Sequence, residues 1–122
     1  NERSENMFTD NYTRKAIVKR IIDGDTLDVL VDCGFRRFSY ERLRLNRINT
    51  PEIRGEERED GLVAKSFVEE LLPVGTEIHM TSVKEASFGR WLAEVYYTVG
   101  TDIQCNLSDT LLFNNLAEIY KP

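Results

Sequence analysis

The stretch RKAIVKRIIDGDTLDVLVD, residues 14–32, joins two apolar segments through one turn signal. Residues 14–22 are rich in β-branched side chains, and residues 27–32 alternate apolar with more polar positions. Both patterns are typical of β-strands. Asp23-Gly24 lies between them and is typical of a turn. The stretch therefore predicts two consecutive strands.

The rest of the chain continues this pattern with further strands and two helices. Alternation predicts a third strand over residues 38–48, with Leu43 and Leu45 on one face. The remaining predicted elements are a helix from about 61 to 72, strands over 77–83 and 91–99, and a short helix over 107–114. Three strands, a helix, two strands and a helix predict an α+β protein, mainly β, with a five-stranded OB-fold-type barrel. One helix then lies between strands 3 and 4, and a second short helix follows strand 5.

Individual residues predict where the two helices begin and end. Asp60 can cap the first helix, and Pro73 ends it. Asn106 with Asp109 resembles a capping pair at the start of the second helix. Asn115 can end that helix in the left-handed conformation.

Length and composition bound the class of protein. The 122 residues fit a polar, flexible N-terminal segment over 1–12 and a single domain over 13–122. No apolar run approaches the ~20 residues of a membrane span, so we expect no membrane partner. The net charge of −5 argues against a surface that coats nucleic acid broadly, but it allows an enzyme with locally concentrated positive charge. The sequence does not decide between the cytoplasm and secretion.

Two aspartates of the Asp23-Gly24-Asp25-Thr26 cluster form the first candidate site. Spaced two apart in an extended segment, Asp23 and Asp25 project to the same side. Carboxylates held together repel each other unless a cation or a proton lies between them. For this tetrapeptide alone, an ordinary hairpin turn is the better interpretation.

Three further clusters supply complementary chemistry. They are Arg44 on the third strand, Asn49-Thr50-Pro51-Glu52 at its exit, and Gly89-Arg90 ahead of an apolar strand. Guanidinium groups hold phosphate oxygens in pairs, and a carboxylate can position or deprotonate water. Each cluster is weak alone. Together they contain the parts needed for phosphodiester hydrolysis assisted by a metal ion.

With these clusters in this order, the sequence resembles the staphylococcal nuclease (thermonuclease) family from about Lys15 to Ala117. The resemblance rests on Asp-Gly-Asp-Thr, on Arg44 ahead of Thr50-Pro51-Glu52, on the amphipathic helix and on Gly89-Arg90 opening a strand. It implies an OB-type barrel and a calcium-dependent endonuclease that hydrolyses DNA or RNA. It also implies a preference for single-stranded or flexible substrate. We expect a monomer.

The resemblance also implies a role for each residue at the matching positions. Asp25 resembles the main metal carboxylate, and Asp23 a neighbour of the calcium ion that acts through water. Thr50 is similar to a ligand that binds calcium through its backbone carbonyl. Asn49 occupies the position of the family's second metal-binding aspartate, so the amide oxygen would be the ligand.

The catalytic roles are implied in the same way. Glu52 resembles the carboxylate that orients the attacking water, and Arg44 and Arg90 resemble the phosphate-binding pair. The sequence departs from the family pattern at Ser87 and Phe88, where the family has a lysine and a tyrosine that contact nucleotide. Tyr120 is a loosely aligned candidate for a nucleotide-stacking tyrosine.

A second function class remains open. A barrel that binds nucleic acid or protein without cleaving would explain Asn49 and the acidic charge. A binding module, however, has no need for the combination of Asp25, Glu52 and the two arginines. A purely structural domain leaves the same residues unexplained.

Overall fold

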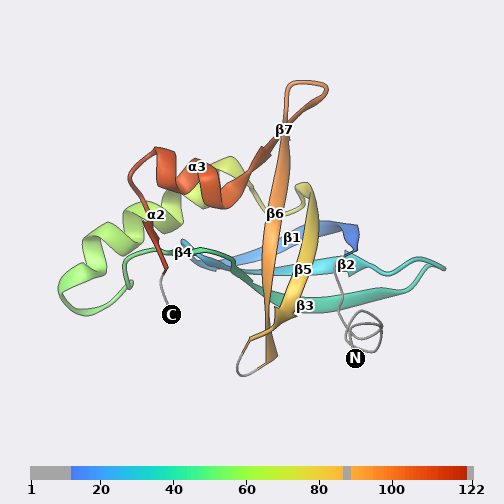
Figure 1. Ribbon diagram of the computed structural model, residues 1–122, viewed down its shortest axis with the longest axis horizontal. Coiled ribbons are helices and arrows are strands. Elements are labelled where there is room, and N and C mark those ends of the chain that lie inside the picture. Colours follow the sequence, from blue (N-terminus) through green and yellow to red (C-terminus); the bar gives the residue numbers. More distant parts are fainter. Residues whose placement is uncertain (1–11, 87–88, 121–122) are drawn as a thin grey trace, which may run out of the picture.

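The computed structural model describes residues 12–86 and 89–120. Five strands form a closed mixed barrel, namely β1 (Thr13–Asp23), β2 (Thr26–Asp32), β3 (Phe38–Leu45), β5 (Glu77–Glu85) and β6 (Arg90–Val99) (Figure 1). Antiparallel pairs link β3, β2, β1, β5 and β6 in that order, and a parallel β3–β6 pair closes the ring. The predicted α+β fold with a five-stranded OB-type barrel is confirmed. Nearly all of the predicted flexible segment 1–12 lies outside the described residues.

The barrel interior is filled by the alternating apolar side chains of its strands. Leu43 and Leu45 share the inner face of β3 and are fully buried, as their alternation predicts. Trp91 is half-buried and packs against the core. Burial of large aliphatic side chains contributes about 1.5–3 kcal/mol each, so this interior holds the fold together. The other core residues include Ala16, Val18, Leu27, Val29, Ile78, Met80, Ala93 and Val95.

The first helix, α2 (Arg58–Leu71), begins earlier than the sequence predicts. A short 3₁₀ turn, η1 (Gly55–Glu57), leads into it, and Glu57 is its N-cap without a side-chain hydrogen bond. The prediction that Asp60 caps the helix is therefore wrong, because Asp60 lies inside the first helical turn. The helix packs closely on the preceding loop at Gly61, where a Cβ would overlap the carbonyl oxygen of Glu52.

The predicted third strand, residues 38–48, is also divided. β3 ends at Leu45, and Arg47 has a positive φ of 73° that turns the chain before β4 (Ile48–Asn49). A positive φ in a residue other than glycine is strained and needs tertiary support. β4 pairs with β8 (Glu118–Ile119), a short segment that the sequence pattern does not reveal.

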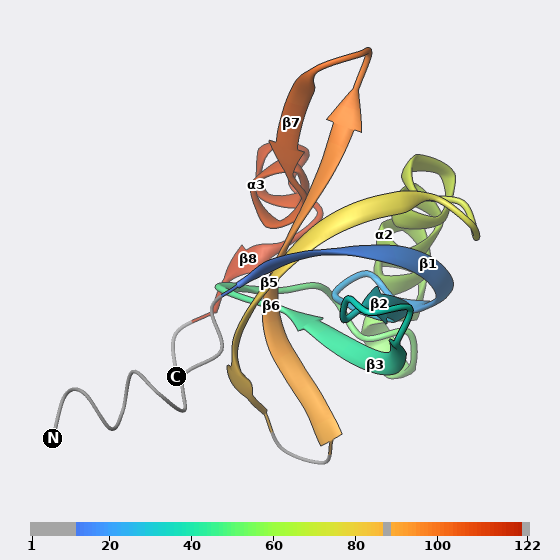
Figure 2. The ribbon, with the colours of Figure 1, turned by 90° about the vertical axis from the view of Figure 1, so that its right-hand side faces the viewer.

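The second helix follows an additional strand. β7 (Ile103–Asn106) pairs with β6 beyond the barrel and leads into α3 (Leu107–Phe113) (Figure 2). The Asn106 side chain accepts a hydrogen bond from the Asp109 amide at 3.0 Å, which confirms the predicted cap. Asn115 has a φ of 58°, so the predicted left-handed residue after the helix is also confirmed. Neither α2 nor α3 is long and apolar enough to cross a membrane, and the same holds for every helix in the described part of the chain.

Candidate active-site pocket

A pocket of about 810 Å³ opens beside the β1–β2 turn. Its walls come from that turn, the end of β3, the segment after β4, the first turn of α2 and the chain after α3. All seven site residues predicted from the sequence line it: Asp23, Asp25, Arg44, Asn49, Thr50, Glu52 and Arg90. The barrel therefore brings together residues that lie far apart in the chain.

The Asp23–Asp25 pair forms the floor of this pocket. The Asp25 amide donates a hydrogen bond to Asp23 Oδ1 at 3.2 Å, because the turn between β1 and β2 brings the two residues together. Burial, followed by the hydrogen bond and the charge of Asp25, raises the pKa of Asp23 from 3.8 to about 6. Near neutral pH both carboxyls are then largely ionised, which is the repulsion that a bound cation would relieve.

Asp25 is the more strongly held of the two carboxylates. Burial opposes its ionisation, but hydrogen bonds from Asp23 and the Thr50 amide and the charge of Arg44 together lower its pKa. The Thr50 amide donates to Asp25 Oδ2 at 3.0 Å, and the Thr26 hydroxyl donates to Oδ1 at 3.1 Å. Asp25 is therefore a fixed anion on the pocket wall.

Arg44 reaches from β3 into the pocket, and its side chain is only 15% exposed. Its Nη1 donates to the carbonyl oxygens of Leu45 and Ile48, each at 2.9 Å, and lies 3.3 Å from Asp25 Oδ2. Its Nη2 donates to Asn49 Oδ1. The guanidinium is therefore oriented by the turn after β3 and bridges Asp25 and Asn49.

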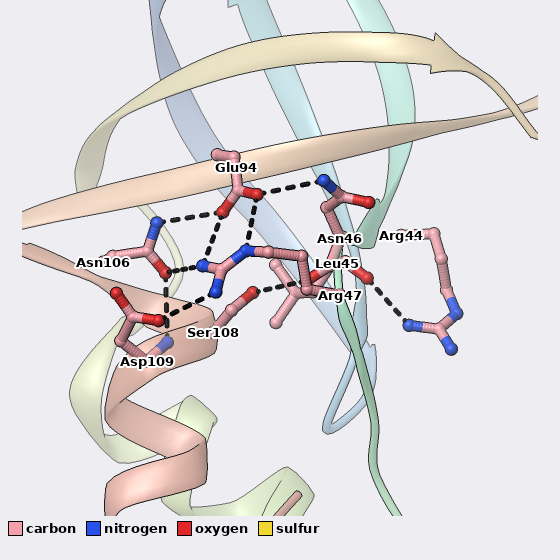
Figure 3. Close-up of polar contacts among 8 residues, drawn as sticks. All are labelled: Arg44, Leu45, Asn46, Arg47, Glu94, Asn106, Ser108 and Asp109. Atoms are coloured by element: carbon pink, nitrogen blue, oxygen red, sulfur yellow. Dashed lines mark hydrogen bonds and ion pairs between the residues drawn. The ribbon is translucent and has the colours of Figure 1, made fainter. Parts of the chain in front are cut away.

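That turn is fixed by a network around Arg47, which the sequence analysis missed (Figure 3). Arg47 Nε and Nη2 donate to the two carboxylate oxygens of Glu94 at 2.9 and 3.0 Å. Its Nη1 donates to Asp109 at 3.0 Å, on the first turn of α3. The buried Ser108 hydroxyl donates to the Asn46 carbonyl at 3.0 Å. Contacts between residues this distant in sequence leave no periodic signal, so no local pattern predicts them.

Thr50 and Glu52 are placed by close backbone packing. A Cβ on Gly24 would lie 2.9 Å from the Thr50 side chain, so only glycine allows this approach. Thr50 Oγ1 is buried and has no hydrogen-bond partner within residues 12–86 and 89–120. The Glu52 amide donates to Glu57 at 3.3 Å, and its side chain remains 66% exposed at the pocket rim. Gly61 fixes the Glu52 backbone against α2 in the same way.

Arg90 lies at the start of β6, directly beside Arg42 in the parallel β3–β6 pair. Across the pocket as a whole, acidic side chains outnumber arginines. They are Asp23, Asp25, Glu52, Glu57, Asp60 and Glu118, against Arg44, Arg54 and Arg90. An excess of carboxylates favours a bound cation. Ser87 and Phe88, where the sequence departs from the family pattern, lie outside the described residues. Tyr120 follows β8 and is half-exposed.

The oxygen atoms gathered here suit a hard cation such as calcium. Asp23 and Asp25 supply carboxylates, and Asn49 and Thr50 can supply neutral amide and backbone carbonyl oxygens. Within residues 12–86 and 89–120, no three acidic, histidine or cysteine side chains converge as a complete set of metal ligands. A calcium ion held here would take its anionic ligands from Asp23 and Asp25 and most of its other ligands from water.

No protein-family model matches this sequence, and comparison with curated proteins finds no significant match.

Proposed function

We propose that the protein is a calcium-dependent endonuclease that hydrolyses phosphodiester bonds of DNA or RNA. The observation that carries this proposal is the convergence of all seven predicted residues on one pocket. Two arginines there can hold a phosphate, one exposed carboxylate can act on water, and an anionic pair can hold a cation. A binding surface alone needs no such combination.

Arg44 and Arg90 bind the scissile phosphate in this mechanism. A guanidinium donates two parallel hydrogen bonds to phosphate oxygens, which both orients the group and offsets its charge. Since the phosphate gains negative charge as water attacks, prearranged donors stabilise the transition state more than the bound substrate. The two carbonyl bonds of Arg44 are consistent with this role, because they leave the guanidinium little freedom.

Glu52 orients the attacking water and accepts its proton. Its carboxylate is exposed at the pocket rim while its backbone is held against α2, so it can meet solvent without losing its position. When bound, calcium would be held by Asp25, Asp23, Thr50 and Asn49 and would supply Lewis-acid stabilisation of the phosphate. The protein residues themselves bind the substrate, position the water and take the proton.

Single-stranded or flexible nucleic acid is the substrate class that we propose, and the protein acts as a monomer. The overall charge of −5 gives little electrostatic gain from wrapping a duplex. A flexible strand can instead place one phosphate in the pocket between Arg44 and Arg90.

A non-catalytic nucleic-acid- or protein-binding barrel is the second candidate. One observation favours it: Arg44 already bridges Asp25 and Asn49, so its charge is partly neutralised within the protein. A phosphate that enters the site has to compete with these partners. Under this alternative the pocket binds but does not cleave.

Cleavage assays on single-stranded DNA and RNA separate the two candidates. We expect cleavage with calcium, weaker or no cleavage with magnesium, and none with chelator. Glu52→Gln should lower turnover by roughly 10²–10⁴-fold, which is the usual contribution of a positioned acid–base group, with little change in binding. Asp60→Asn is the matched control in the same pocket and should retain turnover. Full activity in Glu52→Gln, or equal activity with chelator, would contradict the proposal.

A further inference from the structure

The outer face of β3 carries aromatic and basic side chains in one row. Phe38, Tyr40, Arg42 and Arg44 alternate with inward-facing residues and therefore share this face. Phe38 and Tyr40 are each 57% exposed, and Arg44 ends the row in the pocket. At about 3.3 Å per residue, the row runs roughly 20 Å. We call Phe35, Phe38, Tyr40 and Arg42 the β3 strip.

The hairpin tip at the far end of the strip presents a further aromatic ring. The β2–β3 hairpin extends away from α2 (Figure 1). Arg37 N donates to Gly34 O at 2.9 Å, and the two central residues, Phe35 and Arg36, have φ values of 56° and 60°. This is the geometry of a type I′ turn, in which Asn-Gly is strongly preferred. The chain instead has Phe-Arg in a strained conformation, with Phe35 96% exposed.

One carboxylate, Asp28, orients the polar side chains of the strip. Arg42 donates to both oxygens of Asp28, at 2.8 and 3.2 Å, and the Tyr40 hydroxyl donates to the same carboxylate at 3.1 Å. Arg20 on β1 acts on Asp28 as well, so two arginines face one carboxylate. Asp28 holds Tyr40 and Arg42 in place, and the charges of Asp28 and Asp23 balance those of the two arginines.

We infer that the β3 strip binds the strand of single-stranded nucleic acid that leaves the catalytic pocket. Exposed aromatic rings are stacking platforms for bases, and Arg42, which follows them on the same face, can contact a phosphate. The strip continues along β3 to Arg44. A nucleic-acid strand bound in the pocket can therefore also contact the strip. The inference rests on the proposed function, because it names how the same substrate is held beyond the scissile phosphate.

Other occupants fit these features less well. A protein partner or a second copy of this acidic chain would gain from the apolar rings but would not require a row of arginines that ends in the pocket. The strained turn favours a functional role for Phe35 and Arg36 over a structural one, since residues in sparsely populated conformations concentrate at binding sites.

The decisive variant is Phe35→Asn with Arg36→Gly. It installs the preferred type I′ residues, so the fold should be kept and the melting temperature should be equal or higher. Affinity for a fluorescently labelled 12-nucleotide oligothymidylate, measured by anisotropy in chelator, should fall roughly ten-fold, given the stacking contribution of an aromatic ring. The slope of log affinity against log salt should also become shallower by about one phosphate contact. Phe113→Ala is the matched control, because Phe113 is 87% exposed on α3, away from the strip.

Cleavage of two substrates separates this inference from the proposed function. For the 12-mer, the double variant should raise KM and leave kcat unchanged, whereas a dinucleotide that reaches only the pocket should be cleaved as by the parent. Parent-like affinity for the 12-mer in the double variant would overturn the β3 strip while leaving the nuclease intact. A parent that binds through the strip but cleaves nothing would overturn the nuclease alone. A parent dimer that the double variant converts to monomers in light scattering would identify the strip as a self-association surface and overturn the inference.

Discussion

Arg44, near the end of β3, and Arg47, in the turn that follows, meet different surroundings (Figure 3). Arg47 pairs with two carboxylates, and its main partner Glu94 also accepts hydrogen bonds from Asn46 and Asn106. Arg44 faces a pocket in which two carboxyls crowd each other. We call the charged groups around Arg47 the closed network, because they pair with one another. We call the pocket around Arg44 the open region.

The difference between these regions separates stability from chemistry. In the closed network each charge has an opposite charge beside it, which lowers the pKa of Glu94 and raises that of Arg47. In the open region burial raises the pKa of Asp23, and the buried Thr50 hydroxyl has no hydrogen-bond partner among the residues that the structure describes. Buried polar groups without partners reduce stability and concentrate at functional sites. Substitutions in the two regions should therefore affect different measurements.

The largest expected effect comes from parallel lysine substitutions at the two arginines. Lysine keeps the charge but loses the planar fork that matches phosphate oxygens. Arg44→Lys should lower kcat by roughly 10²–10³-fold with a smaller change in substrate affinity, since a prearranged donor acts mainly in the transition state. Arg47→Lys should leave kcat within a few-fold of the parent. Steady-state kinetics on single-stranded DNA with calcium measures both.

Arg90→Lys tests whether Arg90 acts together with Arg44. It should resemble Arg44→Lys if both guanidiniums hold the phosphate. If both variants lose affinity but not turnover, the pocket is a binding site and the non-catalytic alternative is favoured.

The next largest effect is a loss of stability when the closed network is disrupted. Arg47→Ala leaves Glu94, whose side chain is 16% exposed, without its main partner and releases the link to α3. Arg47 itself is 43% exposed, so solvent screens part of the loss. We expect a destabilisation of about 2 kcal/mol in urea unfolding. Arg36→Ala is a control on a surface turn, and an equal loss there would show that the Arg47 network adds nothing.

These two regions also mark what could be predicted from the sequence. The barrel follows from strand alternation, and Leu43 and Leu45 face inward as that alternation requires. The pocket residues could be named because short local motifs carry them. The strand break at Arg47 could not be predicted, because a positive φ in arginine is sustained only by contacts with β6 and α3. The start of α2 could not be predicted either, because its N-cap, Glu57, makes no side-chain hydrogen bond and follows a 3₁₀ turn.

A smaller effect is the dependence of protein stability on pH, to which Asp23 in the open region contributes. Its pKa is raised from 3.8 to about 6 in the folded chain, so between these values the folded chain binds more protons than the unfolded chain. Stability from this group is complete below pH 3.8 and is lost as the pH rises through 6. The lowered pKa values of Asp25 and Asp28 act below pH 3.8 and that of Glu94 acts below pH 4.5, where stability is lost as the pH falls.

Thermal melts of the protein in chelator test this dependence. Between pH 4 and pH 6.5 we expect a loss on the order of 1 kcal/mol after solvent screening, seen as a drop of a few degrees in Tm. Asp23→Asn should flatten the profile in this window, and Asp32→Asn on the distant hairpin should not. A flat profile in the parent would contradict the crowding of Asp23 and Asp25.

The smallest expected effect comes from Asn49→Asp, which adds a charge where Arg44 meets the pocket. Asn49 Oδ1 accepts a hydrogen bond from Arg44, whose guanidinium also pairs with Asp25. A carboxylate at position 49 would add negative charge to the cation site, and ligand charge is a main determinant of calcium affinity. The calcium concentration for half-maximal activity should therefore fall several-fold. The calcium-free protein should keep its Tm, because Arg44 lies between the two carboxylates and offsets their repulsion.

Asn115→Asp is the matched control for this substitution, because it adds the same charge to another wall of the same pocket. If both variants shift the calcium dependence equally, the effect is a general one of pocket charge and Asn49 is not a ligand. If Asn49→Asp alone lowers the calcium requirement, its side chain coordinates the ion directly. A parent that is inactive at every calcium concentration beside an active Asn49→Asp would make the natural protein a binding module, since a single missing carboxylate would then separate binding from cleavage. In that case the contacts of Arg44 within the protein would keep it from acting on a phosphate, as those of Arg47 do. The two arginines would then no longer differ in function.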